Sequence, residues 1–392
     1  MKKPRFALLN MDLIHGDGDD NDENKDFCDT TYRGDGLTIG KDYLRFEGRT
    51  VSRGTLDPTA LSFEETIGRG AFSKVQRAIW KCQTKAPCEV AIKQYSVLCD
   101  GTTQQRRQML IQELRSLCQM DNPCLIKLHG AFLEEDTVTM VLEYCDKGSL
   151  EYFICQRRNN TPFSQPMVAA VTYQILIGLE HLHNHRILHR DIKSENILVH
   201  SDGRIKLCDF GLASMGDQSL HKTMVGTTKF MAPERLRAQP YGRSSDIWSF
   251  GMVLRHMLTG EKPWDGISSI VDLLVTIEET PVSDLVPDNL EKGLKEILSS
   301  SLKHAPTKRM PAKVLLKSPC FSVAHRISQV TDAMKIVVLD LEEEESKCGT
   351  KRRKNMDTSS VSKRRTMHSP ETKLNRCNSN EVGKKQMTPS HC

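Results

Sequence analysis

The hydrophobic pattern of this chain changes character once, at about Gly148, and that change limits the possible folds more than any other feature. Before Gly148, short apolar runs of strand length surround one stretch with helical spacing; after it, apolar residues recur mainly at helical spacing. Strands with a single helix, followed by a mostly helical half, predict an α+β fold with two lobes. The clearest runs are the strands 90–92 and 139–142, the helix with Leu110, Leu114 and Leu117, and the helices 168–183 and 245–258.

Composition divides the 392 residues into a folded body and two polar extensions. We expect an N-terminal extension at residues 1–60, a folded domain at 61–321 and a C-terminal extension at 322–392. Residues 17–26 hold six acidic residues and one lysine, and residues 346–392 hold twelve Lys and Arg against three Asp and Glu. We expect both segments to be disordered, because they have too few apolar residues to form a core. Weak alternation over residues 37–50 predicts a short hairpin before the main domain.

The composition also argues against several classes of protein. No run approaches the roughly 20 apolar residues of a membrane span, and no secretory signal precedes the acidic tract, so we expect a cytoplasmic protein without a membrane span. The 13 cysteines include no Cys-x-x-Cys pair, which argues against structural zinc and favours reduced thiols. A net charge of +5 gives no reason to expect specific nucleic-acid binding.

Two motifs in the strand-rich half indicate a phosphate-binding site. Gly68 and Gly70 lie in a glycine-rich stretch, where the absence of Cβ atoms lets a backbone turn approach phosphate oxygens. Lys93 ends the strand Val90-Ala91-Ile92 and carries a charge that can reach such phosphates. Taken singly, the glycines also fit an ordinary turn, and Lys93 also fits a surface position on a strand edge.

A glutamate on the predicted helix offers Lys93 a partner. Glu113 lies between Leu110 and Leu114, close to the apolar face of that helix. A solvated position on the helix flank is the commoner fate of a glutamate. An ion pair with Lys93 would instead hold the ammonium where a phosphate needs it, and both interpretations stay open at this point.

Asp191, Asn196 and Asp209 place three oxygen-bearing side chains within a short stretch of the helical half. Carboxylate and amide oxygens are ligands for Mg²⁺, and a free carboxylate can orient a hydroxyl group. Lys193 adds a positive charge that can neutralise a phosphoryl group in transfer. Each element alone has an ordinary explanation, but their order and spacing together indicate phosphoryl transfer.

In this order, the motifs resemble the signature set of eukaryotic protein kinases. The resemblance covers about residues 61–321 and includes His189-Arg190-Asp191, Asp209-Phe210-Gly211 and Ala232-Pro233-Glu234. It implies a bilobal protein kinase fold, with a small antiparallel β lobe that carries one regulatory helix and a larger, mainly α lobe. It also implies ATP and Mg²⁺ as cofactors. The sequence departs from the family pattern at Ser73, Ala305 and Met310, none of which is a catalytic position.

The resemblance implies a role for each residue of the site. Asp191 would be the catalytic base, Lys193 and Asn196 would also be catalytic, and Asn196 and Asp209 would hold Mg²⁺. Residues implied in ATP binding are Ile67, Gly68, Gly70, Val75, Ala91, Lys93, Glu113, the hinge residues Glu143 and Cys145, Leu198 and Asp209. Structural pairs and clusters implied are Glu234 with Arg309, and a hydrophobic spine of Leu117, Leu128, His189 and Phe210.

Ser219 and Thr223 resemble the activation segment of a dual-specificity mitogen-activated protein (MAP) kinase kinase. This implies that an upstream activating kinase phosphorylates both residues, that Arg190 pairs with the phosphates, and that a downstream MAP kinase is the substrate, modified on Thr and Tyr. The alternative is that both are ordinary polar loop residues. Ser194 departs from that branch and resembles kinases one tier higher or Ste20-like kinases, so a serine/threonine kinase of another tier stays open. A kinase-fold scaffold is the remaining alternative.

The N-terminus carries a candidate docking peptide. Its basic residues precede apolar residues that alternate, as in the peptide by which MAP kinase kinases hold a MAP kinase. Basic clusters at 351–354 and 363–365 resemble a two-part nuclear import signal, so a nuclear location stays open alongside the alternative of a solvated basic tail. The docking residues are Lys2, Lys3, Arg5, Leu9, Met11 and Leu13.

Overall fold

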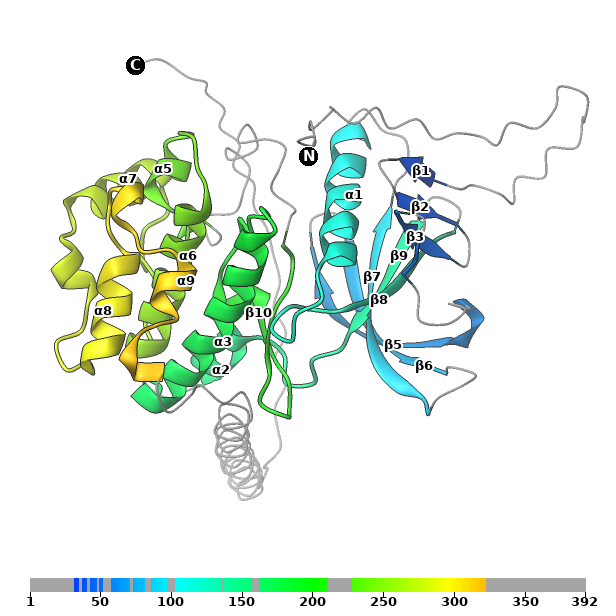
Figure 1. Ribbon diagram of the computed structural model, residues 1–392, viewed down its shortest axis with the longest axis horizontal. Coiled ribbons are helices and arrows are strands. Elements are labelled where there is room, and N and C mark those ends of the chain that lie inside the picture. Colours follow the sequence, from blue (N-terminus) through cyan, green and yellow to red (C-terminus); the bar gives the residue numbers. More distant parts are fainter. Residues whose placement is uncertain are drawn as a thin grey trace, which may run out of the picture. The chain divides into compact units, whose positions relative to one another are not determined.

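The computed structural model describes residues 32–34, 37–40, 43–47, 49–51, 58–70, 73–81, 86–96, 103–134, 137–156, 162–210 and 228–321. By its internal contacts the chain divides into residues 1–341 and 342–392, and all described residues belong to the first unit. They form a smaller lobe of antiparallel strands with one helix and a larger, mainly helical lobe (Figure 1). The α+β class and the two-lobed arrangement predicted from the sequence are confirmed.

A five-stranded antiparallel sheet in the order β5-β6-β7-β9-β8 forms the smaller lobe. Side chains alternate between its faces. On β7, Val90 and Ile92 are fully buried against strands β5, β6 and β8, whereas Ala91 and Lys93 point to the other face. The strands are β5 (Leu61–Arg69), β6 (Ser73–Trp80), β7 (Cys88–Ser96), β8 (Leu128–Glu134) and β9 (Thr137–Glu143).

Helix α1 (Thr103–Gln119) lies beside this sheet (Figure 1). Leu110, Leu114 and Leu117 are all buried, as their i, i+4, i+7 spacing predicts. Glu113, one residue before Leu114, is also buried, with 2 % of its surface exposed. The helix therefore presents a charged residue to the interior together with its apolar face.

A second, four-stranded antiparallel sheet precedes the main sheet and packs on β8. Leu37, Ile39 and Leu44 are fully buried, and the Gly40 carbonyl accepts a hydrogen bond from the backbone N–H of Leu133 on β8 (2.9 Å). The hairpin predicted over residues 37–50 is thus the centre of a larger sheet. Its strands are β1 (Tyr32–Gly34), β2 (Leu37–Ile39), β3 (Leu44–Phe46) and β4 (Arg49–Thr50).

Helix α6 (Arg243–Thr259) runs through the centre of the larger lobe and is buried on nearly all sides. Gly260, which follows it, has a φ of 71°, the left-handed conformation that ends helices and that glycine adopts without strain. Around α6 lie α2 (Leu150–Gln156), α3 (Gln165–Asn184), α5 (Pro233–Leu236), α7 (Ile270–Glu279), α8 (Lys292–Ser301), α9 (Ala312–Leu315) and the short 3₁₀ helices η5 (Val282–Leu285), η6 (Pro306–Lys308) and η7 (Pro319–Phe321).

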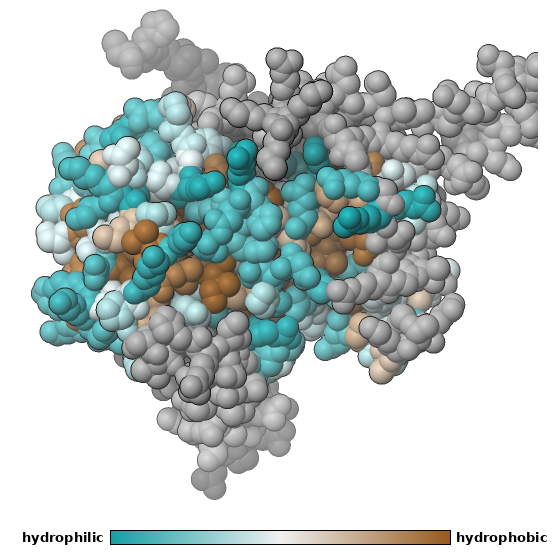
Figure 2. Space-filling view, viewed as in Figure 1, coloured by the Kyte–Doolittle hydropathy of each residue, from teal (hydrophilic) through white to brown (hydrophobic). Residues whose placement is uncertain are grey.

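A short hairpin, β10 (Ile197–Val199) and β11 (Ile205–Leu207), joins the two lobes. Its backbone reaches the smaller lobe through the Ile126 N–H, which donates to the Leu207 carbonyl (2.9 Å). The surface seen in Figure 2 is largely hydrophilic, with hydrophobic patches on both lobes. Among the described residues, no helix is both long and apolar enough to cross a membrane.

Candidate active site

A buried group of charges joins the two lobes. Lys93 Nζ on β7 lies 2.9 Å from Glu113 Oε1 on α1 and 2.5 Å from Asp209 Oδ1, which follows β11. Tyr95, two residues after Lys93 on the same strand, donates from its hydroxyl to the second oxygen of Glu113 (2.6 Å). The ion pair considered from the sequence is therefore present, and its carboxylate is fixed from both sides.

The charges in this group stabilise one another. Burial alone lowers the pKa of the Lys93 ammonium, but the carboxylates of Glu113 and Asp209 outweigh burial and raise that pKa well above its ordinary value. Burial raises the pKa of the Asp209 carboxyl, and Lys93 outweighs it, so that pKa is lowered. Burial raises the pKa of Glu113, and Lys93 offsets this only in part. Lys93 is thus a permanent cation held at the inner end of the site.

Strand register brings the glycine-rich stretch over Lys93. Gly68 on β5 pairs with Val75 on β6, and Val75 pairs with Lys93 on β7. The Gly70 N–H donates to the Ser73 carbonyl (2.8 Å), and a Cβ at Gly70 would lie 2.8 Å from the Ser73 hydroxyl, so a larger residue there would force that hydroxyl to move. A Cβ at Gly68 would make an ordinary contact with Val75, at 3.6 Å, so packing against Val75 does not require glycine at this position.

The chain passes between the lobes at Glu143 and Cys145, where the sequence places the hinge. Glu143 turns its side chain away from Lys93: its Oε2 lies 2.8 Å from the ammonium of the buried Lys206 on β11. Ala91 on β7 pairs with Leu142 beside the hinge, and Leu198 on β10 is half-buried. Ile67 on β5 is 45 % exposed.

A rigid loop holds Asp191. Asn196 Nδ2 donates to Asp191 Oδ2 (2.8 Å) and to its carbonyl oxygen (2.9 Å), and Lys193 Nζ lies 2.9 Å from Asp191 Oδ2. Burial lowers the pKa of Lys193, but Asp191 outweighs it and raises that pKa, so the lysine stays charged beside the carboxylate. The structure therefore brings together the three residues predicted to be catalytic.

Asp246 on α6 anchors the start of this loop. Its two carboxylate oxygens accept from the backbone N–H groups of His189 (2.9 Å) and Arg190 (2.8 Å), and His183 Nε2 lies 2.9 Å from Oδ2. Arg190 adopts a left-handed φ of 70°, a conformation that costs about 1–3 kcal/mol and persists only where its surroundings enforce it. Asp246 supplies that enforcement.

The donor set fits a divalent cation. The backbone N–H of Cys208 donates to the Asn196 carbonyl (3.1 Å), which brings the backbone just before Asp209 beside Asn196. Asn196 uses its amide nitrogen to bond Asp191, so its amide oxygen is left to act as a ligand. One amide oxygen and one carboxylate are hard ligands that suit Mg²⁺ shared with phosphate oxygens. Asn196 and Asp209 would hold such an ion.

The structure does not describe some of the predicted residues, and it adds others that the sequence interpretation did not include. Ser219 and Thr223 and all six docking residues lie outside the described residues. Cys208 sits beside Asp209, and burial raises the pKa of its thiol well above the ordinary value. The sequence interpretation missed Tyr95 and Lys206, although Tyr95 is two residues from Lys93 and so shares its strand face.

The implied structural contacts are also present. Arg309 and Glu234 form a bidentate ion pair inside the larger lobe. Leu117, Leu128 and Phe210 are buried in one hydrophobic cluster, and the rings of His189 and Phe210 have centroids 6.2 Å apart.

The chain matches the protein kinase domain family over residues 61–321 and belongs to the protein kinase family. Membership implies the use of ATP and a divalent metal ion.

Individual relatives are similar to the chain over about two thirds of its length. Mitogen-activated protein kinase kinase kinase ANP1 of Arabidopsis thaliana is 34 % identical over 276 residues, which are 68 % of this chain and 40 % of that protein. Mitogen-activated protein kinase kinase kinase 1 of Homo sapiens is 31 % identical over 66 % of this chain and 17 % of that protein. Serine/threonine-protein kinase pak-2 of Caenorhabditis elegans is 31 % identical over 71 % and 52 %. The chain thus spans about half or less of these relatives' lengths.

Proposed function

We propose that this chain is a serine/threonine protein kinase that uses ATP and Mg²⁺. The observation that carries the proposal is the convergence of Lys93, Glu113 and Asp209 on one side of the site and of Asp191, Lys193 and Asn196 on the other. Because no catalytic position of the kinase pattern is substituted, an active enzyme is favoured over a scaffold.

The chain's own residues divide the work of phosphoryl transfer. Lys93, fixed by Glu113, would bind phosphate oxygens, and the glycine-rich stretch at Gly68 would let them approach the backbone. Mg²⁺, when bound, would neutralise phosphate charge. Asp191 would orient the hydroxyl of the substrate and accept its proton, and Lys193 would balance the charge that develops on the transferred group. Lys193 at this position also resembles the serine/threonine type rather than the tyrosine type.

We further propose a place in a MAP kinase cascade, with the tier of the MAP kinase kinase kinases as the first candidate. Two of the relatives described above carry that name, and the third is a serine/threonine-protein kinase. Ser194, in the position where MAP kinase kinases carry proline, supports the same assignment. The substrate would then be a MAP kinase kinase, phosphorylated on Ser or Thr.

The second candidate is the tier that the sequence motifs favoured, a dual-specificity MAP kinase kinase. It is supported by the spacing of Ser219 and Thr223 and by the docking pattern of residues 2–13. In this case the substrate would be a MAP kinase, bound through the N-terminal peptide and modified on Thr and Tyr. The distribution between cytoplasm and nucleus, set by residues 351–365, would follow the substrate.

Both candidates share one mode of regulation. Among the described residues, Arg190 has no hydrogen-bond partner for Nε and Nη1, although both atoms are buried. Its guanidinium lies 5.7 Å from the centre of the Tyr241 ring. Buried donors without acceptors are costly, and a phosphate on the segment 211–227 would supply acceptors. This supports activation by phosphorylation at Ser219 and Thr223.

One experiment separates the candidates. The full chain with Ser219→Glu and Thr223→Glu is incubated with ATP, Mg²⁺ and either a catalytically dead MAP kinase kinase or a catalytically dead MAP kinase, and phosphosites are read by mass spectrometry. Modified Ser or Thr in the activation segment of the former supports the first candidate; Thr and Tyr in the latter support the second. The control is the same protein with Asp191→Asn. If it matches the active form on both substrates, the enzymatic proposal fails.

A further inference from the structure

Ser194 connects the catalytic loop to two helices of the larger lobe. It lies between Asp191 and Asn196 in the 3₁₀ turn η3 (Ser194–Asn196) and is fully buried. Its hydroxyl donates to Glu151 Oε2 on α2 (2.8 Å) and lies 3.1 Å from Nδ1 of His256 on α6. The two partners are far from Ser194 in sequence, so these bonds hold the loop to its surroundings.

The protons of this group can be assigned. A carboxylate only accepts, so the Ser194 hydroxyl proton points to Glu151, and the Ser194 oxygen is left to accept from His256 Nδ1–H. Burial lowers the pKa of His256 to about 4, so near neutral pH the imidazole carries one proton, on Nδ1. Burial raises the pKa of Glu151, but hydrogen bonds from Lys262 and Ser194 outweigh it and lower that pKa, so the carboxylate stays ionised. Each of these two hydrogen bonds therefore has a defined donor and acceptor: Ser194 donates to Glu151, and His256 donates to Ser194.

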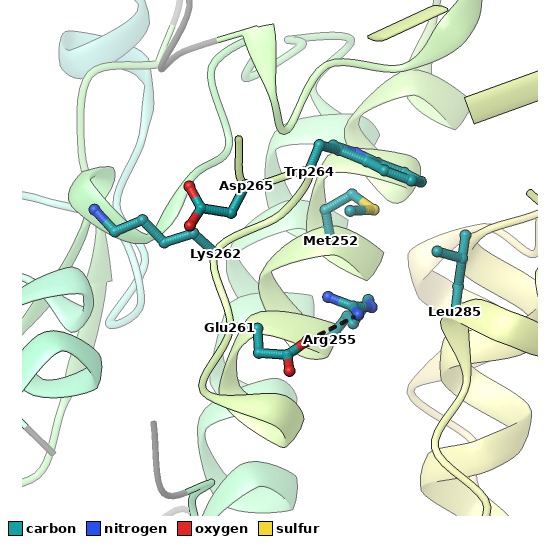
Figure 3. Close-up of a pocket in the computed structure, with 7 residues that line it drawn as sticks. All are labelled: Met252, Arg255, Glu261, Lys262, Trp264, Asp265 and Leu285. Carbon is teal, nitrogen blue, oxygen red and sulfur yellow. Dashed lines mark hydrogen bonds and ion pairs between the residues drawn. The ribbon is translucent and has the colours of Figure 1, made fainter. Parts of the chain in front are cut away.

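Lys262, in the loop between α6 and α7, completes the group. Its Nζ lies 2.9 Å from Glu151 Oε1. Lys262 also lines a cavity of about 460 Å³, but Figure 3 shows its side chain turned away from Met252, Arg255 and Leu285 on the other side of the loop. Arg255 has a separate partner, Glu261, at 3.4 Å. The ammonium of Lys262 is thus committed to Glu151 rather than to the cavity.

The loop that carries Asp191 and Asn196 is fixed at two points, by Asp246 before Asp191 and by the bonds of Ser194 after it. Asp246 binds the backbone N–H groups of His189 and Arg190, just before Asp191. Ser194 is fixed three residues after Asp191. A single 3₁₀ turn has weak hydrogen-bond geometry of its own, so its placement depends on such outside contacts.

We infer that Ser194 and Glu151 are positioning residues for phosphoryl transfer: supported by His256 and Lys262, they fix the backbone that carries Asp191 and Asn196. The inference rests on the proposed kinase activity. It concerns geometry at the reacting centre and leaves the binding of ATP by Lys93 and the hinge unaffected. Displacement of a catalytic group by about 1 Å can cost up to about 100-fold in rate.

The test compares Ser194→Ala, Glu151→Ala and Glu151→Gln in the full chain, on a protein substrate that the wild type phosphorylates. We expect Ser194→Ala and Glu151→Ala to lower kcat about tenfold or more, with KM for ATP within about twofold of wild type. Glu151→Gln keeps an acceptor for the Ser194 hydroxyl and should restore most of kcat. The double variant Ser194→Ala/Glu151→Ala should be no worse than either single variant, because both remove the same bond.

Glu261→Gln is the matched control, since it removes a charge next to Lys262 without touching the group, and it should behave as wild type. Circular dichroism and the affinity for a non-hydrolysable ATP analogue are measured for every variant. A wild-type kcat for Ser194→Ala, or losses that multiply in the double variant, would overturn the inference alone. Loss of nucleotide affinity in parallel with kcat would also overturn it, as a general structural effect. An inactive wild-type protein would overturn the proposed function as well.

Discussion

The ion pair between Arg309 and Glu234 gives the most direct test of how the larger lobe is held together. Arg309 has no exposed side-chain surface, and all five of its N–H donors are used. Two parallel bonds go to Glu234, at 2.6 and 2.9 Å, and three go to backbone carbonyls of Ser244, Lys303 and His304. The guanidinium also lies 5.0 Å from the centre of the Trp248 ring.

Replacing Arg309 by methionine keeps apolar volume over Trp248 and removes every one of these donors. The carboxylate of Glu234 would be left buried, and the side-chain donor that it keeps is the Ser245 hydroxyl (2.6 Å). Breaking a buried ion pair by removing one partner costs about 3–5 kcal/mol. Since 1 kcal/mol shifts Tm by about 2–4 °C in a domain of 150–250 residues, we expect Tm to fall by roughly 6–20 °C.

The assay is thermal unfolding followed by circular dichroism at pH 7, for wild type, Arg309→Met and the double variant Arg309→Met/Glu234→Leu. Replacing both members of a buried pair by apolar residues is often neutral, so the double variant should recover much of the lost Tm. A Tm for Arg309→Met within about 2 °C of wild type would refute the reasoning. So would a double variant less stable than the single one, because the cost would then not come from an uncompensated carboxylate.

Three further outcomes are expected. Burial raises the pKa of Glu234, but the bonds from Arg309 and Ser245 outweigh burial, so the pKa of Glu234 is lowered below its ordinary 4.5. The ionised Glu234 therefore stabilises the fold fully above its ordinary pKa. This stabilisation is lost as pH falls through the lower pKa that Glu234 has in the folded protein. The Tm gap between wild type and Arg309→Met should therefore narrow from pH 6 to pH 3, and a gap that widens would contradict this. Tyr95→Phe removes the bond to Glu113 and, at about 1.5–3 kcal/mol for a bond to a charged group, should lower kcat/KM for ATP at least several-fold in steady-state assays, whereas unchanged kinetics would show that Lys93 alone fixes Glu113. Asp246→Ala leaves the N–H groups of His189 and Arg190 unpaired and should lower both Tm and kcat; a loss of Tm with kcat intact would separate the stability of the lobe from the geometry of the loop.

Local patterns in the sequence predicted the main elements of the fold. The helix with Leu110, Leu114 and Leu117 and the strand Val90–Ile92 are each defined by residues within a few positions of one another, so their periodicity is visible without a partner. The sheet β1–β4 was seen only as a hairpin, because strands of two or three residues carry too little alternation to be recognised.

The residues of the site could also be predicted only where they are close together in the sequence. Asp191, Lys193 and Asn196 are close in sequence, and their spacing indicated their common role. The partners of Ser194 lie 43 and 62 residues away, so no local pattern indicated them. The tier of the cascade was inferred from Ser219 and Thr223, in a segment that is a small part of the matched domain, while similarity over the whole domain favours relatives of another tier.

The sheet β1–β4 has a practical consequence for where this protein can be cut. β8 is an edge strand of the five-stranded sheet, and an uncovered edge is a template for pairing with other chains. Gly40 occupies part of that edge, and Leu37, Ile39 and Leu44 bury apolar surface beside it. The described structure therefore begins about 30 residues ahead of the boundary of family similarity. We expect a fragment of residues 61–321 alone to aggregate through the exposed edge of β8. A fragment that begins ahead of Tyr32 would keep that edge covered.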